Sequence, residues 1–300
     1  MILITGATGF LGSRVLSSLL DHGHEVVAVK RSSSKTDKIV AVLSHPRLHL
    51  FDIDVEDPAR LFERHAVDTI IHTATEYGRG ATPLYSILEA NLLLPLRLAE
   101  QGINHGVRCF INTDSFFNKG NSSYSNLLNY ALSKKSLLIW LDKLSSKLKI
   151  INVMLEHIYG PGDSPAKFVE GIIQQVAIDR VPHVALTYGH QRRDFVFLDD
   201  VVAAYLALVE FGRRENFEFE TFELGTGDSV EIRTFVELVK QISGSPTELG
   251  FGDIPYRPDE IMMSRADTSK LRRLGWRPTT TVEEGLRIIL SDYLAGRHGG

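Results

Sequence analysis

The chain has 300 residues, of which 43% are hydrophobic and 23% charged, a composition typical of a folded globular protein. The formal net charge of −4 argues against a nucleic-acid partner or a polybasic contact with a membrane. No apolar run approaches the roughly 18 residues that span a bilayer, the N-terminus shows no secretory signal, and the single cysteine allows no internal disulfide, so we expect a cytoplasmic protein.

The first half of the chain alternates short apolar strands with helical patterns. Strands are predicted over residues 2–5, 25–29, 48–51, 69–72, 107–112 and 150–153, and helices over 11–20, 58–65, 84–100 and 124–148. Near-continuous apolar strands that alternate with helices indicate a parallel sheet covered on both faces. We therefore predict an α/β fold with a Rossmann-type, doubly wound parallel sheet.

The pattern becomes less regular after residue 153. A turn cluster at 160–165 precedes a helix at 168–178, a strand at 195–198, and helices at 200–211, 230–242 and 282–294. The last helix follows a capping box, Thr281-x-x-Glu284. We expect a first domain over residues 1–157 that also receives about 193–212, and a smaller C-terminal lobe over 158–300 that is interleaved with it.

A glycine triplet, Gly6-x-x-Gly9-x-x-Gly12, follows the first strand and opens the first helix. Glycines at this place allow a tight turn and a close approach to a pyrophosphate, which the helix N-terminus attracts. A triplet alone is weak and could mark a turn that binds nothing, but strand, triplet and helix together predict dinucleotide binding. The residues expected to line this contact are Thr8, Phe10 and Leu11.

The second strand ends in two cations, Lys30 and Arg31, followed by Ser32. Domains that use NAD commonly place an acid here, whereas an arginine can bind the 2′-phosphate of NADP. We therefore expect NADP(H) in preference to NAD(H), with Arg31 and Ser32 on the phosphate; a solvated basic strand end is the alternative. The other predicted cofactor contacts are Asp52, which could accept from the adenine amino group, Ile53 and Ala74.

Tyr130 and Lys134 stand four residues apart, which on a helix places them on one face. The charge of Lys134 is expected to lower the tyrosine pKa, so that Tyr130 can exchange a proton with a substrate oxygen while Lys134 also binds the nicotinamide ribose. The spacing is common by chance. It gains weight because Thr113 ends the preceding strand, at the sheet edge where ligands bind, and can donate to the same oxygen.

Together these motifs resemble the extended short-chain dehydrogenases/reductases, the NAD-dependent epimerase/dehydratase family of nucleotide-sugar epimerases, dehydratases and reductases. The resemblance covers nearly the whole chain and includes the motifs Tyr159-Gly160-Pro161-Gly162 and Arg193-Asp194-Phe195-Val196. Within the family the chain is most similar to bacterial CDP-abequose synthases and related CDP-4-keto-3,6-dideoxyhexose reductases. The less common stretches that carry this similarity are residues 74–78, 112–117, 155–159 and 260–262.

The resemblance implies roles for individual residues. Thr113 and Tyr130 would polarise and protonate a sugar keto oxygen, and Lys134 would tune Tyr130 and hold the cofactor ribose. Arg193 and Arg257 would bind the diphosphate of a nucleotide sugar, which the guanidinium fork suits. The other residues expected at the substrate are Tyr77, Asp114, Ser115, His157 and Asn91, of which Asn91 would support the active-site backbone.

Three positions depart from the patterns of the family. Sugar 4,6-dehydratases follow the Thr-Asp pair with a glutamate, but here Ser115 follows, so the carboxylate base for dehydration is missing. His157 replaces an asparagine that many epimerases use on the substrate, and Met154 replaces a common family arginine. The departures argue against dehydration and leave the exact substrate open.

Two further expectations concern metals and partners. The eleven histidines show no convincing ligand spacing, so we expect no metal. The helix around Tyr130 carries apolar residues on more than one face, which indicates burial against another chain, and the family often pairs through this helix. A homodimer is therefore expected; burial by the C-terminal lobe is the alternative.

The sequence as a whole predicts an NADPH-dependent reductase of the C4 keto group of a nucleotide-activated deoxysugar, in the synthesis of a bacterial surface polysaccharide such as lipopolysaccharide. One alternative is a nucleotide-sugar 4-epimerase with tightly held NAD, against which the basic strand end argues. A second is a non-catalytic, NADP-sensing regulator on the same fold. The intact set of Thr113, Tyr130 and Lys134 argues against the regulator.

Overall fold

The computed structural model describes residues 1–119 and 127–297. The chain divides into two compact units, of which the first comprises Met1–Leu155 with Val202–Phe222 and the second Glu156–Val201 with Glu223–Gly300. We had expected the boundary at 157/158 and a returning segment of about 193–212. The segment that returns to the first unit therefore begins and ends later than its sequence pattern suggested.

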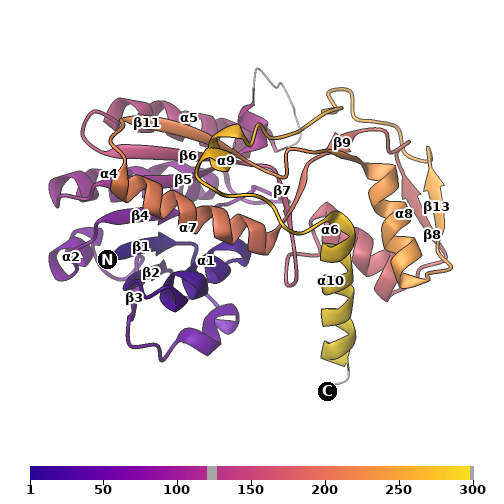
Figure 1. Cartoon of the computed structure of the whole chain (residues 1–300), viewed down its shortest axis with the longest axis horizontal. Helices are drawn as coiled ribbons and strands as arrows, with labels where there is room; N and C mark the ends of the chain where they lie inside the picture. Colours follow the sequence, from indigo (N-terminus) through magenta and orange to yellow (C-terminus); the bar gives the residue numbers. More distant parts are fainter. Residues whose placement is uncertain (120–126, 298–300) are drawn as a thin grey trace. The chain divides into compact units, whose positions relative to one another are not determined.

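A sheet with the strand order β11-β6-β5-β4-β1-β2-β3 forms the centre of the first unit among the described residues (Figure 1). Neighbouring strands from β1 to β6 pair in parallel. The side chains of β1, β2, β4, β5 and β6 are mostly buried, as in a sheet covered on both faces, whereas the edge strand β3 buries Phe51 and leaves Leu50 exposed. The strands are β1 (Ile2–Thr5), β2 (Val26–Lys30), β3 (Leu48–Asp52), β4 (Thr69–His72), β5 (Cys109–Ser115), β6 (Lys149–Leu155) and β11 (Phe219–Leu224).

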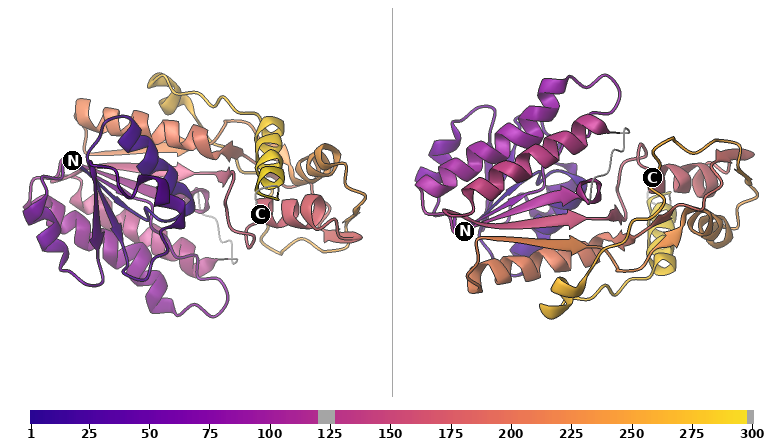
Figure 2. Two further views of the ribbon diagram at one scale, coloured as in Figure 1. Left: turned by 90° about the horizontal axis from the view of Figure 1, so that it is seen from below. Right: turned by 90° about the horizontal axis from the view of Figure 1, so that it is seen from above.

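Helices cover both faces of this sheet (Figure 2). One face carries α2 (Pro58–Arg64), α4 (Leu94–Asn104) and α5 (Leu128–Leu144), which share an apolar core with the strands. The opposite face carries α1 (Phe10–Asp21) and α7 (Leu198–Arg214). The packing of α7 is so close that a Cβ on Gly212 would lie 2.7 Å from the Cys109 sulfur. The shorter helices are α3 (Leu84–Leu88), η1 (Asp37–Val42), η2 (Glu89–Leu93) and η3 (Phe116–Asn118).

The second unit has its own apolar core, built around the stacked rings of Phe195 and Phe235, whose centroids are 4.3 Å apart. Its strands form two-stranded pairs, β10 with β7, β12 with β9 and β13 with β8. The strands are β7 (His157–Tyr159), β8 (His183–Leu186), β9 (Arg192–Arg193), β10 (Phe195–Phe197), β12 (Val230–Glu231) and β13 (Glu248–Phe251). The helices are α6 (Phe168–Ile172), η4 (Ile173–Ile178), α8 (Ile232–Ser243), α9 (Ser269–Arg273) and α10 (Val282–Arg297).

The predicted fold class is confirmed, and most predicted elements are present. The continuous helix expected over 84–100 is interrupted by the π-helical turn η2, and the helix expected from 230 begins as strand β12. The start of the helix expected at Tyr124 lies outside the described residues. The capping box is confirmed, because Thr281 Oγ1 accepts from the Glu284 N–H at 3.2 Å while the Glu284 carboxylate accepts from the Thr281 N–H at 2.9 Å.

No helix in the described part of the chain is both long enough and apolar enough to cross a bilayer.

Candidate functional site

The glycine turn brings the chain after β1 against the chain after β4. Gly6 has φ +68°, in the left-handed region that favours glycine, and a Cβ there would lie 2.6 Å from the Ala74 nitrogen. A Cβ on Gly12 would lie 2.1 Å from the Gly6 carbonyl oxygen, and Gly9 caps the start of α1. The predicted contacts Gly6, Gly9, Gly12 and Ala74 therefore share one place. Thr8, Phe10 and Leu11 are partly exposed beside it.

The predicted basic end of β2 is more balanced than its sequence suggested. The Lys30 ammonium pairs with the Asp52 carboxylate at 2.5 Å, and the Lys30 carbonyl accepts from the Ile53 N–H at 2.9 Å. Both the N–H and the hydroxyl of Ser32 donate to Asp54 at 2.7 Å. We had expected the Ser32 hydroxyl to donate to a 2′-phosphate, but here its proton is used in the bond to Asp54. Arg31 is exposed at this strand end. Of the two predicted cations, Arg31 is the one that lacks a carboxylate partner within the described residues.

Thr113 and Lys134 meet at the carboxyl end of β5. The Lys134 ammonium donates to the Thr113 carbonyl oxygen at 2.8 Å, so α5 is tied to the strand by a buried charge. Burial lowers the pKa of Lys134 to about 8, and the charge of Asp114 acts in the opposite direction. The Thr113 hydroxyl lies 2.6 Å from the hydroxyl of Tyr205, which α7 contributes from the opposite face of the sheet. Thr113 is thus held through both its backbone and its side chain.

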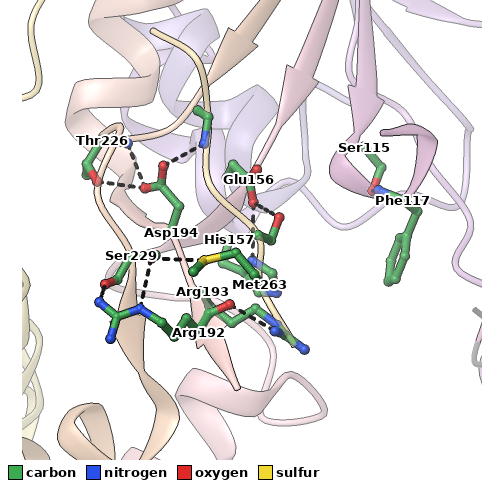
Figure 3. A network of polar contacts seen from close by, with 12 residues as sticks. Ser115, Phe117, Glu156, His157, Arg192, Arg193, Asp194, Thr226, Ser229 and Met263 are labelled. Atoms are coloured by element: carbon green, nitrogen blue, oxygen red, sulfur yellow. Dashed lines mark hydrogen bonds and ion pairs between the residues drawn. The ribbon is translucent and has the colours of Figure 1, made fainter. Parts of the chain in front are cut away.

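Tyr130 is buried in a small aromatic cluster near the same strand end. Its ring centroid lies 5.0 Å from that of Tyr77 and 6.1 Å from that of Phe117. Its phenol hydrogen bonds with the Ser115 and Thr75 side chains. Ser115 also accepts from the Phe117 N–H at 3.3 Å (Figure 3). The predicted residues Tyr77, Ser115 and Tyr130 therefore lie together.

The expected lowering of the Tyr130 pKa is wrong for the protein without ligand. Burial raises the pKa of this phenol well above its ordinary value, and the nearby Tyr77 and Asp114 add to the rise. The hydrogen bonds with Ser115 and Thr75 lower it by less. The desolvation of an ionised phenol therefore exceeds the stabilisation that was expected from Lys134. Tyr130 is consequently a neutral phenol that holds its proton at physiological pH.

Asp114 is buried and fully engaged. Its carboxylate accepts from Asn118 at 2.7 Å and from Asn152 at 3.0 Å, and Asn152 in turn accepts from Asn112 at 2.8 Å. Burial raises its pKa, whereas the bond from Asn152 lowers it. With 2% of its surface exposed, Asp114 is held by these bonds at the end of β5, and the substrate contact expected of it stays a prediction.

Asn91 connects the segment after β4 to α5. Its amide donates to the Glu76 carbonyl at 2.8 Å and to the Ser133 hydroxyl at 3.0 Å, and its oxygen accepts from the Glu76 N–H at 2.8 Å. It stands in the π-helical turn η2, a feature that often marks functional positions. These bonds join the backbone at Glu76 to α5, and the support of an active-site backbone that the resemblance implied stays a prediction.

His157 and Arg193 lie in the second unit, on β7 and β9. Burial lowers the pKa of His157, and the Glu156 carboxylate, 3.7 Å from its Nδ1, acts in the opposite direction. Arg193 is 7% exposed and donates to Glu260 at 2.5 Å. Arg257 is exposed, and its carbonyl accepts from the Glu260 N–H at 3.1 Å. Arg193 and Arg257, predicted from distant parts of the sequence, are thus linked through Glu260.

Asp194, next to Arg193 in the motif, is a structural group (Figure 3). Its carboxylate accepts from the N–H and hydroxyl of Thr226, both at 2.7 Å, and from the N–H groups of Gly227 and Ala266 at 3.0 and 3.1 Å. Burial raises its pKa, and these bonds lower it. The residue joins three segments of the second unit.

The described residues contain no group of three or more His, Cys, Asp or Glu side chains that could hold a metal ion.

Comparison with known proteins identifies the family. Residues 2–225 match the model of the NAD dependent epimerase/dehydratase family. A CDP-abequose synthase of Salmonella muenchen is 34% identical over 295 residues, which cover 97% of this chain and 97% of that protein. Among solved structures, a UDP-glucose 4-epimerase of Thermotoga maritima has a TM-score of 0.84 at 24% identity, with 99% of both chains covered. A UDP-glucose 4-epimerase of Stenotrophomonas maltophila has a TM-score of 0.85 at 21% identity, with 100% and 99% covered.

The chain belongs to the NAD-dependent epimerase/dehydratase family. It is an enzyme of the extended short-chain dehydrogenase/reductase type, in a group of NAD(P)-dependent enzymes that modify nucleotide sugars. The glycine turn fits such a cofactor, because Gly6 and Gly12 allow the tight strand–turn–helix packing of a dinucleotide site, where a Cβ would lie 2.6 or 2.1 Å from other backbone atoms. The family and the enzyme class inferred from the sequence are confirmed.

Several residues of the site were not found from the sequence. Tyr205, which bonds to Thr113, lies in no motif, and Thr75, which bonds to Tyr130, lay in the stretch 74–78 but was not singled out. A signal existed for Tyr205, since a tyrosine on the apolar face of a helix needs a partner for its hydroxyl. Glu260 lay in a stretch that resembles relatives, but nothing in the sequence indicated that it would bond to Arg193.

We expect Gly12→Ala to weaken binding of both NADH and NADPH. The added Cβ would meet the Gly6 carbonyl at 2.1 Å, so the turn must shift, and overpacking of this kind costs about 1–3 kcal/mol. Isothermal titration calorimetry should show roughly tenfold weaker binding or more. Gly171→Ala, another helical glycine whose Cβ would lie 3.1 Å from a carbonyl, is the matched control. Equal binding by Gly12→Ala and the unaltered protein would contradict the assignment of this turn.

Proposed function

We propose that this enzyme reduces the C4 keto group of a nucleotide-activated deoxysugar, of the CDP-4-keto-3,6-dideoxyhexose type, with NADPH. The observation that carries the proposal is the similarity, over 97% of both chains and at 34% identity, to a CDP-abequose synthase, a protein of nucleotide-deoxysugar chemistry. The site supports it, because Thr113, Tyr130 and Lys134 gather around the end of β5. The product would serve the synthesis of a surface polysaccharide.

The protonation state of Tyr130 suits a reduction. A ketone that accepts hydride at carbon needs a proton at oxygen, and a phenol whose pKa is raised by burial holds that proton at neutral pH. When bound, the nicotinamide supplies the hydride. Tyr130 gives its proton to the C4 oxygen, Thr113 orients that oxygen by a hydrogen bond, and Lys134 places its positive charge beside the strand end. One reduced nicotinamide and one proton are consumed per alcohol formed.

The absence of an acid after Asp114 separates this reaction from dehydration. Ser115 occupies that position and bonds to Tyr130, so it supports the proton donor and supplies no base for a C5 proton. A second candidate function, nucleotide-sugar 4-epimerisation with retained NAD, draws support from the fold, because solved structures of high similarity are UDP-glucose 4-epimerases. Their identity to this chain stays below 25%, so this support concerns the fold alone.

We infer that Arg193 and Arg257 serve the diphosphate of the nucleotide sugar. Arg193 is nearly buried, and the planar fork of its guanidinium is suited to phosphate oxygens. His157, on the adjacent β7 strand of the same unit, would present a neutral imidazole, since burial lowers its pKa. These three roles stay predictions.

The reaction can be tested with purified protein, NADPH or NADH, and CDP-, dTDP-, GDP- and UDP-linked 4-keto sugars. We expect stoichiometric loss of absorbance from NADPH with a CDP-linked 4-keto-3,6-dideoxyhexose. Tyr130→Phe should lower kcat by about 10²–10⁴-fold, the usual contribution of general acid catalysis, and leave NADPH binding intact. Tyr188→Phe, which removes the hydroxyl of a half-exposed tyrosine, is the control. Interconversion of UDP-hexoses without net loss of reduced nicotinamide would instead support the epimerase.

We propose that NADPH is preferred because of Arg31. Lys30 is neutralised by Asp52, and Ser32 donates to Asp54, so the exposed Arg31 is the cation left for a 2′-phosphate. A hydrogen bond to a charged group contributes about 1.5–3 kcal/mol, so Arg31→Ala should weaken NADPH binding roughly 10–100-fold and change NADH binding little. Lys35→Ala, an exposed cation four residues along, is the control. Tighter binding of NADH than NADPH by the unaltered protein would overturn the preference.

We propose that the chain forms a homodimer through the outer faces of α3, η2 and α5, which contact one another in the first unit. Large apolar side chains are exposed there, among them Trp140 at 55% and Tyr85 at 73%, together with Leu84, Leu93, Leu132 and Ile139. Exposed apolar patches of this kind mark interfaces.

Trp140→Glu should convert the dimer to a monomer, because it would bury a charge in the interface. Light scattering coupled to gel filtration measures the mass. Ile288→Glu, which alters an exposed isoleucine on α10 of the second unit, should leave the mass unchanged. A monomeric unaltered protein, or a Trp140→Glu variant that stays dimeric, would refute this interface.

A further inference from the structure

The hydroxyl of Tyr205 is one of two groups that hold Thr113 in place. Tyr205 lies on α7 with none of its surface exposed, and its oxygen is 2.6 Å from Thr113 Oγ1. The second group is the Lys134 ammonium, which binds the Thr113 carbonyl at 2.8 Å. Lys134 therefore binds the backbone of Thr113, and within the described residues Tyr205 is the hydrogen-bond partner of the Thr113 hydroxyl. The proposed reaction assigns no role to Tyr205.

The hydrogen count of this pair determines which atom donates. Each hydroxyl carries one proton, and either oxygen can accept. If Thr113 donates to Tyr205, its proton is used and it cannot donate to a substrate oxygen. If Tyr205 donates, the Thr113 proton is free. A ketone oxygen can only accept, so in its presence both protons find acceptors in one pattern: Tyr205 donates to Thr113, and Thr113 donates to the ketone.

The surroundings of Tyr205 favour this direction. Burial raises the pKa of its phenol, so the group is neutral and retains a proton to donate. Its bond to Thr113 is the one hydrogen bond of the phenol found in the described part of the chain. A buried phenol without an acceptor is costly, so the geometry gives its proton one destination.

We propose that Tyr205 is a positioning residue that turns the Thr113 hydroxyl into a donor directed at the substrate carbonyl oxygen. The proposal rests on the role of Thr113 in the proposed function. A phenol that donates also polarises the hydroxyl that accepts, which strengthens the second hydrogen bond of the chain. The hydrogen bond from Thr113 to the carbonyl oxygen strengthens as negative charge develops on that oxygen. The effect of Tyr205 therefore falls on kcat more than on KM.

The test is a double-mutant cycle of Tyr205→Phe and Thr113→Val. We expect Tyr205→Phe to lower kcat about tenfold with KM for the keto sugar changed less than about twofold, as for the loss of one hydrogen bond made to the transition state. Thr113→Val should lower kcat further. In the Thr113→Val background, Tyr205→Phe should have no additional effect, because the hydroxyl through which it acts is gone.

Tyr159→Phe is the matched control. It also removes a buried tyrosine hydroxyl, which donates to the Thr281 carbonyl at 3.3 Å in the second unit, and it should leave kcat unchanged. Thermal unfolding is measured for all variants, with kinetics well below the lowest midpoint. If Tyr205 had only a structural role, the tenfold loss of kcat in Tyr205→Phe would multiply with the loss in Thr113→Val. Multiplying losses, or an unchanged kcat in Tyr205→Phe, would overturn the proposal.

Different results would refute the role of Tyr205 and the reductase function. If the unaltered protein consumes NADPH and Tyr205→Phe behaves like it, the reductase stands and the role of Tyr205 falls. If the unaltered protein instead interconverts UDP-hexoses, the reductase falls. The same cycle is then measured on that interconversion, which also passes through a C4 carbonyl, and non-additive losses are still required.

Discussion

The close approach of two backbone segments at the carboxyl edge of the sheet is the constraint on which the rest of the first unit depends. Gly6 and Gly12 leave no room for a side chain, so the start of α1 and the segment at Ala74 lie against each other. The chain that continues from Ala74 contains Thr75, which bonds to Tyr130, and Glu76, whose backbone N–H donates to Asn91. The turn that suits a dinucleotide therefore also positions Thr75 and Glu76, the residues next to Tyr130 and Asn91.

Burial, more than pairing of charges, determines the electrostatics of that centre. Tyr130 and Lys134 are both removed from water, which raises the pKa of the phenol and lowers that of the ammonium. Both shifts favour the neutral forms: Tyr130 keeps its proton at neutral pH, while a pKa of about 8 leaves the Lys134 ammonium mostly charged there. The sequence spacing of the pair suggested the opposite shift for the phenol, because spacing reports proximity but contains no information on desolvation.

The sequence predicted the elements whose pattern is local and missed those that depend on distant partners. β1 and β4 have the predicted bounds because each is a short run made up mainly of apolar and β-branched residues. β11 was missed although Phe219–Leu224 alternates in polarity, since its strand character comes from its place beside β6. Likewise, Thr113 was found by its position at a strand end, while Tyr205, 92 positions later, becomes part of the site only when α7 packs on the sheet.

Arg193 and Asp194 are adjacent in one motif but differ in how their charges are satisfied within the protein. Asp194 accepts four hydrogen bonds from its own chain, so its charge is already satisfied and a further ligand would gain little from it. Arg193 donates to a backbone carbonyl and to the carboxylate of Glu260. The carboxylate occupies a position where the guanidinium attracts an anion. If Arg193 binds a diphosphate as proposed, that group would share or replace the carboxylate. Since two phosphate groups offer more acceptor oxygens than one carboxylate, the guanidinium gains by the exchange, and the buried Arg193 never has to stand without a counter-charge before the substrate arrives.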